Sequence, residues 1–155
     1  MTPVDLTAGE VTALHEALED EYKAWATYDQ VIQDFGAVRP FVNIRESEAR
    51  HVAALAALYE RFALPMPRND WPGRALRFEN LRAACEAAVA GEVENELMYR
   101  RLLAATSTPI IRRVFERLRD ASQQRHLPAF RRCLARQSAN LPMRSGRRHC
   151  ARGRA

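Results

Sequence analysis

The prolines of this 155-residue chain are gathered into short segments that separate long stretches without helix breakers. Proline lacks a backbone donor and clashes with the preceding helical turn, so it is found mainly at helix ends. The stretches between the prolines are rich in Ala, Leu, Glu and Arg, which are all good helix formers. A chain of this length forms one domain. The spacing of the prolines therefore predicts an all-helical domain with four long helices.

Capping residues and apolar spacing locate the ends of the expected helices. Thr7 followed by Glu10 is a capping box, in which each side chain accepts a hydrogen bond from the other residue's backbone amide. A proline in the first turn, as at Pro40 and Pro109, also marks a helix start. Between these signals, apolar residues recur at intervals of three or four. The expected helices, with their caps, are 7–36, 40–62, 74–105 and 108–137.

The longest connection, from Leu64 to Gly73, contains three prolines and lies between the second and third expected helices. Such a segment cannot continue a helix. A short, a long and a short connection are typical of a bundle in which one connection crosses over. We therefore expect residues 1–137 to form an antiparallel four-helix bundle with a longer crossover between its second and third helices. Pro128 should kink the fourth helix or fray its end.

The net charge of +5 belongs to the C-terminal end of the chain. Residues 138–155 contain five arginines and no acid, whereas the rest of the chain carries 19 basic and 19 acidic groups. A polar segment without apolar periodicity is expected to be disordered. Because no aromatic residues are interleaved with the arginines, the tail does not predict a nucleic-acid partner.

The three cysteines, Cys85, Cys133 and Cys150, form no CxxC pair. This excludes a four-cysteine iron or zinc site within the chain. An odd, scattered set fits a reducing cytoplasm, in which Cys85 and Cys133 pack as small apolar side chains. No apolar run reaches the roughly 18 residues that can span a bilayer, and the N-terminus lacks the features of a secretory signal. We therefore expect a cytoplasmic protein that has no membrane partner.

Each apolar stripe is interrupted near its middle by polar residues on the side that should face the core. A buried, unpaired carboxylate costs several kcal/mol even after the protein relaxes around it. Several carboxylates at one level of a bundle therefore need a cation, and the only lysine, Lys23, lies off the stripe. The interrupting residues are Glu21 in the first helix, Glu48 and His51 in the second, Glu92 in the third, and Gln123 and His126 in the fourth.

The interrupting residues repeat between the two halves of the chain. Glu48 and His51 form Glu-x-x-His in the second helix, and Gln123 and His126 form Gln-x-x-His in the fourth. In helical bundles, two metal ions are held by a Glu from each of two helices and Glu-x-x-His from each of the other two. The sequence thus predicts a metal site in which Gln123 replaces one carboxylate. A neutral hydrogen-bonding role suits Gln123 better than a ligand role.

Simpler interpretations remain open for each candidate. Glu-x-x-His also occurs as an exposed pair on helix surfaces, and His126 is alternatively an ordinary buried histidine with a hydrogen-bond partner. The carboxylates assigned to the first and third helices have rivals close by in the sequence. These rivals are Asp20, Glu94 and Glu96, of which Glu96 is also a candidate additional ligand.

One family resemblance accompanies these motifs. The segment RPFVNIRESEARHVAALAALYERFALPMP, with EDEYKAWATY before it and GEVENELMYRRLL and QQRHLPAF after it, resembles the ferritin-like proteins that include rubrerythrins. The resemblance covers roughly residues 10–135 and is greatest to a bacterial branch of unknown function. It implies a di-iron or di-manganese centre in a ferritin-like bundle, with ligands at Glu21, Glu48, His51, Glu92 and His126. The cysteine segment that gives rubrerythrins a built-in electron donor is absent.

Two classes of function follow. The resemblance implies an oxidoreductase with two iron ions, or with manganese or zinc, that acts on peroxide, O₂ or Fe(II) as a peroxidase or ferroxidase and takes electrons from a separate donor. The alternative is a bundle with one metal ion or none, and with a structural, storage or partner-binding role, which Gln123 favours. A homodimer, a larger homo-oligomer or a cage is compatible with either class.

Overall fold

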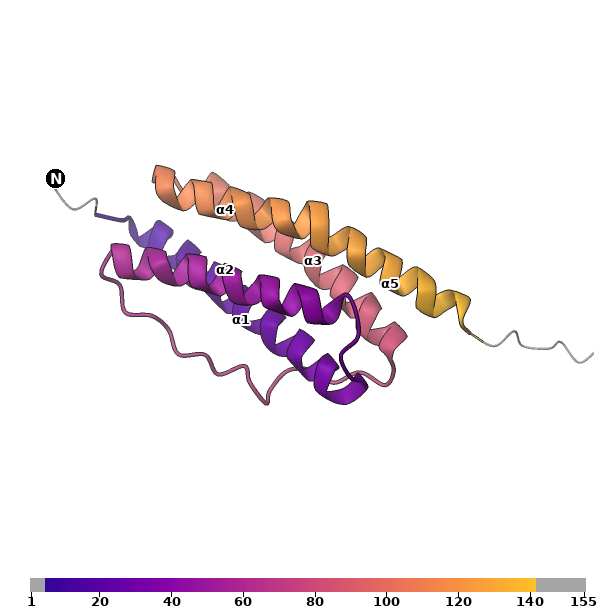
Figure 1. Ribbon diagram of the computed structural model, residues 1–155. Coiled ribbons are helices and arrows are strands. Elements are labelled where there is room, and N and C mark those ends of the chain that lie inside the picture. Colours follow the sequence, from indigo (N-terminus) through magenta and orange to yellow (C-terminus); the bar gives the residue numbers. More distant parts are fainter. Residues whose placement is uncertain (1–4, 142–155) are drawn as a thin grey trace, which may run out of the picture.

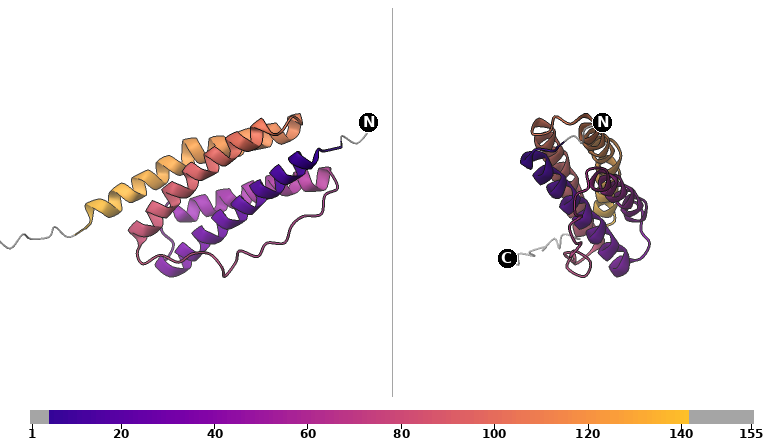
Figure 2. Two further views of the ribbon diagram at one scale, coloured as in Figure 1. Left: turned by 180° about the vertical axis from the view of Figure 1, so that it is seen from behind. Right: turned by 90° about the vertical axis from the view of Figure 1, so that its left-hand side faces the viewer.

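The computed structural model describes residues 5–141, which are all-helical and contain no strand (Figure 1). Helices α4 and α5 are joined by a π-helical turn, η1, so that the three segments form one long rod beside α3 (Figures 1 and 2). Helices α1 and α2 pack against each other as a second pair. The elements are α1 (Ala8–Phe35), α2 (Phe41–Arg61), α3 (Leu81–Ala104), α4 (Pro109–Ala121), η1 (Ser122–His126) and α5 (Leu127–Ala139).

The core consists of two apolar clusters, one toward each end of the helices. One cluster contains Leu18, Leu55 and Phe115, and the other contains Phe41 and Phe130. The residues that interrupt the apolar stripes lie between these clusters along every helix. Burial of the apolar side chains on both sides therefore holds a polar layer in the middle of the protein.

The start of α1 is fixed by the predicted capping box. Thr7 Oγ1 accepts from the Glu10 amide at 3.1 Å, and Glu10 accepts from the Thr7 amide at 3.1 Å. Glu10 also accepts from the Ser107 and Thr108 amides, at 3.1 and 2.9 Å, just before α4 begins. Burial would raise the pKa of Glu10, but the hydrogen bonds from Thr108, Thr7 and Ser107 lower it from 4.5 to about 2. One carboxylate thus ties the starts of two helices together.

The connection between α2 and α3 is longer than the sequence indicated. Helix α3 begins at Leu81 rather than near Arg74, and the Asn80 side chain caps it by accepting from the Ala83 amide at 2.9 Å. Asn is among the strongest N-cap residues, and this cap outweighs the helix-forming residues just before it. The connecting chain runs along the length of the helices from the end of α2 to the start of α3 (Figure 1).

Cys85 and Cys133 are buried and joined by a disulfide that links α3 to α5. The expectation that they pack only as small apolar side chains was therefore wrong. They lie 48 residues apart in the sequence, and only the packing of the two helices brings them together.

Three further expectations concern the end of the bundle, the C-terminal tail and membrane-spanning helices. Helix α5 continues to Ala139, two residues beyond the expected end of the bundle. The predicted disordered tail lies almost entirely in residues 142–155, outside the described residues. Across residues 5–141, none of the helices combines the length and apolarity that a bilayer crossing requires.

Candidate metal centre

The polar layer brings together five of the residues singled out from the sequence, each at most 6% exposed. They come from every helical segment that contributes to the middle of the protein. Each is placed by apolar neighbours three to seven residues away on the same helix face, which pack into the clusters above and below. The five residues are Glu21 of α1, Glu48 and His51 of α2, Glu92 of α3 and His126 of η1.

These side chains form two overlapping groups that share Glu48. Glu21, Glu48 and His51 make one group, and Glu48, Glu92 and His126 make the other. Within each group, one nitrogen or oxygen atom per residue lies within 4.8 Å of the others. A shared carboxylate between two clusters of oxygen and nitrogen donors is an arrangement that could hold two metal ions side by side.

The two histidines turn the same ring nitrogen toward the carboxylates. His51 Nδ1 lies 2.8 Å from Glu48 Oε2 and 3.3 Å from Glu21 Oε2. His126 Nδ1 lies 3.2 Å from Glu48 Oε1 and 3.5 Å from Glu92 Oε2. The rings are stacked, with centroids 5.3 Å apart and planes 19° apart. Both Nδ1 atoms therefore face the shared carboxylate from one side.

Proximity in this layer does not always mean hydrogen bonding. Among the described residues, Glu48 Oε2 and His126 Nδ1 are buried and have no hydrogen-bond partner. Each nevertheless lies close to a complementary atom, which means that the donor directions miss the acceptors. Leaving a buried polar atom unpaired costs about 1–3 kcal/mol. These two atoms therefore lie close to complementary atoms without hydrogen bonding to them, as atoms that share a cation would.

Ser47 sits on the other side of both imidazole rings. Its Oγ lies 2.9 Å from His126 Nε2 and 3.5 Å from His51 Nε2. A neutral imidazole carries one N–H, so an Nε2–H that donates to Ser47 leaves Nδ1 as a lone-pair donor. When Ser47 accepts from both Nε2 atoms, both histidines can bind a metal through Nδ1.

Two tyrosines orient the outer carboxylates. The Tyr99 hydroxyl donates to Glu21 Oε1 at 2.5 Å, and the Tyr28 hydroxyl donates to Glu92 Oε1 at 2.7 Å. Burial and the neighbouring carboxylates hold the pKa of each tyrosine well above its usual value, so that both remain donors. In each carboxylate, the tyrosine occupies one oxygen while the other oxygen faces a histidine.

The pKa values in the layer reflect how strongly its charges interact. Burial lowers the pKa of His51, but the hydrogen bond to Glu21 and the negative charges of Glu21 and Glu48 raise it to about 10. For His126, burial is likewise outweighed by Glu48 and Glu92, which raise the pKa to about 9. Burial and the charge of Glu48 raise the pKa of Glu21. Protons on the histidines are thus one way to balance the carboxylates, and metal ions in their place are another.

The prediction that Gln123 faces the core was wrong, because its side chain is exposed. The wide turn of η1, in which the Leu127 amide donates to the Ser122 carbonyl, shifts the helical register. Ser122 takes the inward position and donates to Glu92 Oε2 at 2.5 Å. The available signal was Pro128, which cannot donate to a carbonyl one turn earlier and so favours a local change in the helix.

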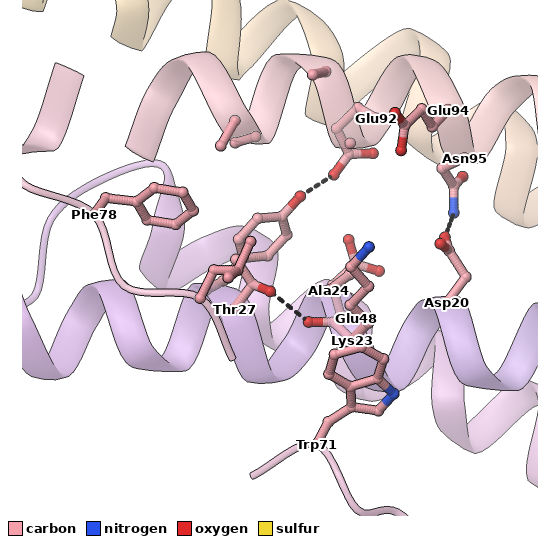
Figure 3. Close-up of a pocket in the computed structure, with 16 residues that line it drawn as sticks. Asp20, Lys23, Ala24, Thr27, Glu48, Trp71, Phe78, Glu92, Glu94 and Asn95 are labelled. Carbon is pink, nitrogen blue, oxygen red and sulfur yellow. Dashed lines mark hydrogen bonds between the residues drawn. The ribbon is translucent and has the colours of Figure 1, made fainter. Parts of the chain in front are cut away.

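The remaining rivals from the sequence do not enter either group. Glu96 is half-buried and pairs with Arg100 at 2.7 Å. Glu94 is exposed, and Asp20 accepts from the Asn95 side chain at 2.7 Å (Figure 3). Burial raises the pKa of Asp20 to about 6. Asp20 and Glu94 line the cavity beside the site, and Glu96 lies in neither group.

Comparison with known proteins supports the fold and gives no relative of named function. No protein-family model matches the chain, and no curated protein is significantly similar to it in sequence. The crystal structure of a hypothetical protein from Methanococcus jannaschii DSM 2661 superposes with a TM-score of 0.80. That match has 21% sequence identity and covers 91% of this chain and 88% of the archaeal chain. At this identity the likeness supports a shared all-helical fold alone.

Proposed function

We propose that this protein is a metalloprotein that binds two divalent transition-metal ions, one in each group, with Glu48 shared between them. The observation that carries the proposal is the pair of buried, unpartnered atoms, His126 Nδ1 and Glu48 Oε2, which lie within reach of other donors without bonding to them. A cation between the donors would satisfy both atoms at once. The residues present therefore fit a metal centre.

The donor set limits which metals are suitable. Three carboxylates and two imidazoles are a mixture that suits iron, manganese or zinc, whereas magnesium and calcium prefer oxygen ligands alone. Fully ionised, the carboxylates of Glu21, Glu48 and Glu92 carry three of the four charges needed to balance two divalent ions. The hydroxyl of Ser122 is neutral, so the group that contains His126 is expected to bind its ion more weakly.

We further infer a ferritin-like architecture, in which the helices form an antiparallel bundle and the segment between α2 and α3 is its crossover. The all-helical fold, the polar layer between two apolar clusters and the length of that segment support this assignment. Bound iron or manganese would supply redox chemistry toward peroxide, O₂ or Fe(II), with electrons from a separate donor. The protein itself keeps the ligand atoms buried and away from water. Tyr28 and Tyr99 fix the orientation of the outer carboxylates.

Anaerobic titration with Fe(II) or Mn(II), followed by elemental analysis, tests the metal proposal. We expect about two equivalents per chain, and a strong loss of binding in His51→Ala. The matched control is His15→Ala, because His15 lies outside both groups and is hydrogen-bonded to the Tyr59 hydroxyl at 2.7 Å. Equal binding by the two variants, or no uptake by the natural chain, would remove the basis for the site.

The redox assignment needs a separate measurement. Metal-loaded protein is mixed with H₂O₂ in the presence of a reductant, and peroxide consumption is compared with that of His51→Ala. Consumption no faster than in the variant would reject the oxidoreductase assignment. Uptake of a single equivalent would instead favour the one-metal alternative, which the replacement of a carboxylate by Ser122 already supports.

A further inference from the structure

A cavity of about 250 Å³ lies between α1 and α3 and reaches the polar layer at Glu48 and Glu92 (Figure 3). Its walls are mostly small or aromatic side chains. Residues from the long connection before α3, Trp71, Leu76 and Phe78, cover its outer side. The cavity is therefore an approach to the candidate metal centre that is partly open to solvent and partly covered by the connection.

The volume exceeds what peroxide or O₂ requires. A dry cavity of about 150 Å³ holds benzene, and one water occupies about 30 Å³ of liquid. The cavity beside Glu48 and Glu92, at about 250 Å³, has room for an organic molecule larger than benzene. Tight packing is the rule in protein interiors, so a space of this size next to a cluster of ligand atoms is unusual.

Gly91 provides an independent argument that the space is functional. It lies inside α3 and lines the cavity, where glycine is less favourable than alanine by about 0.5–1 kcal/mol. Its φ is not positive, and a Cβ added there would meet no atom within 4 Å. Neither backbone conformation nor close packing therefore requires glycine at this position. Gly91 is itself exposed, so the missing side chain leaves open space where the cavity meets solvent, at the cost of helix stability.

The polar atoms that line the cavity indicate which chemical group a ligand would present to them. Asn95 Oδ1 is a buried acceptor without a hydrogen-bond partner among the described residues, and Asn95 lines the cavity beside Glu48. Glu48 and Asn95 are 2% and 7% exposed. A hydroxyl or amino group on the ligand would give such an acceptor a donor. Most of the remaining lining surface is apolar, including Ala24, Ala87 and Ala88, although Asp20 and Lys23 also border the cavity.

Trp71 lines the cavity, and two contacts fix the position of its ring. Its indole N–H donates to Glu19 at 3.0 Å, and the Lys23 ammonium lies 5.9 Å from the ring centroid. These contacts fix the position of the Trp71 ring in the wall of the cavity. A flat ring could stack there when it enters.

We propose that this cavity binds a compact, mostly apolar ring compound with one hydroxyl or amino group, and holds it beside the metal centre. The inference rests on the proposed function and narrows it, because it names what the same site takes besides a metal ion. It does not require that peroxide or O₂ be the only molecule that reaches the site.

The test uses the full chain, with and without metal, and 4-fluorobenzyl alcohol as the probe. Fluorine NMR follows the broadening of the probe signal as protein is added, with glycerol as a polar competitor that should have no effect. Gly91→Leu should fill the cavity and weaken probe binding by about tenfold or more. Ala53→Leu adds the same bulk at an exposed position of α2 and should leave probe binding unchanged.

Circular dichroism melting checks that each variant folds, and Ala87→Leu, one turn earlier in the same wall, replaces Gly91→Leu if that variant does not fold. No saturable binding by the natural chain, or equal binding by the two leucine variants, would overturn the inference. Metal uptake without probe binding would reject the cavity proposal alone. Probe binding that depends on Gly91, in a chain that takes up no metal, would support the cavity as a ligand site and reject the proposed metal function.

Discussion

Ser122→Asp is the substitution that most directly tests the geometry of the site. Ser122 occupies the inward position of η1, and its Oγ lies 2.5 Å from Glu92 Oε2. An aspartate there adds the carboxylate that the group around His126 lacks. Gln123→Glu is the matched control, because it adds the same charge one residue later on an exposed position. The sequence motif alone would assign the larger effect to Gln123.

The size of the effect in metal-free protein follows from the distances. Two like charges about 4 Å apart repel by about 4 kcal/mol at an effective dielectric constant of 20. Desolvation of the added carboxylate costs several kcal/mol more unless it takes up a proton. Because the free energy of unfolding of a domain is only about 5–15 kcal/mol, metal-free Ser122→Asp should melt at least about 10 °C below the natural chain. Gln123→Glu should melt within a few degrees of it.

In the presence of metal, Ser122→Asp should raise the stability of the protein rather than lower it. The added carboxylate balances the remaining charge of two divalent ions, so the more weakly bound ion should be held at least about tenfold more tightly. Anaerobic calorimetric titration with Fe(II) or Mn(II), with melting curves in both states, measures this. A gain in affinity in Gln123→Glu and none in Ser122→Asp would show that the register of η1 is wrong. A melting temperature of Ser122→Asp that stays low in metal, at unchanged stoichiometry, would reject the two-metal site.

Two further predictions concern the hydrogen bonds around the site and at the helix starts. Ser47→Ala removes the partner of His126 Nε2 and should weaken metal binding by about 10–100-fold. Ser138→Ala changes an exposed serine and should leave metal affinity unchanged, so equal affinities of the two variants in the titration would contradict the role assigned to Ser47. Because the pKa of Glu10 is lowered from 4.5 to about 2, its stabilising effect is complete above pH 4.5 and is lost as the pH falls toward 2. Over that range the natural chain should lose about 3 kcal/mol more unfolding free energy than Glu10→Gln in urea denaturation, and parallel pH profiles would refute this.

Much of the helical framework was predictable because its signals are local. The capping box at Thr7 and Glu10 and the proline before α2 determine helix starts through contacts a few residues long. The apolar stripes also placed Glu21, Glu48 and Glu92 on the buried side, because a regular helix repeats its faces every three or four residues. The start of α3 was missed, although Asn80 is a local signal of the same kind.

Only the tertiary structure decided the features that depend on distant contacts or on an irregular turn. The π-helical turn changes the register between the buried face of α4, which continues to Ser122, and the buried face of α5, so that Gln123 lies outside the site. Cys85 and Cys133 meet because α3 packs beside α5. The cavity forms where residues of the connection from α2 lie beside α1 and α3. Sequence periodicity determines which face of a helix is buried, whereas packing between helices determines which buried atoms meet.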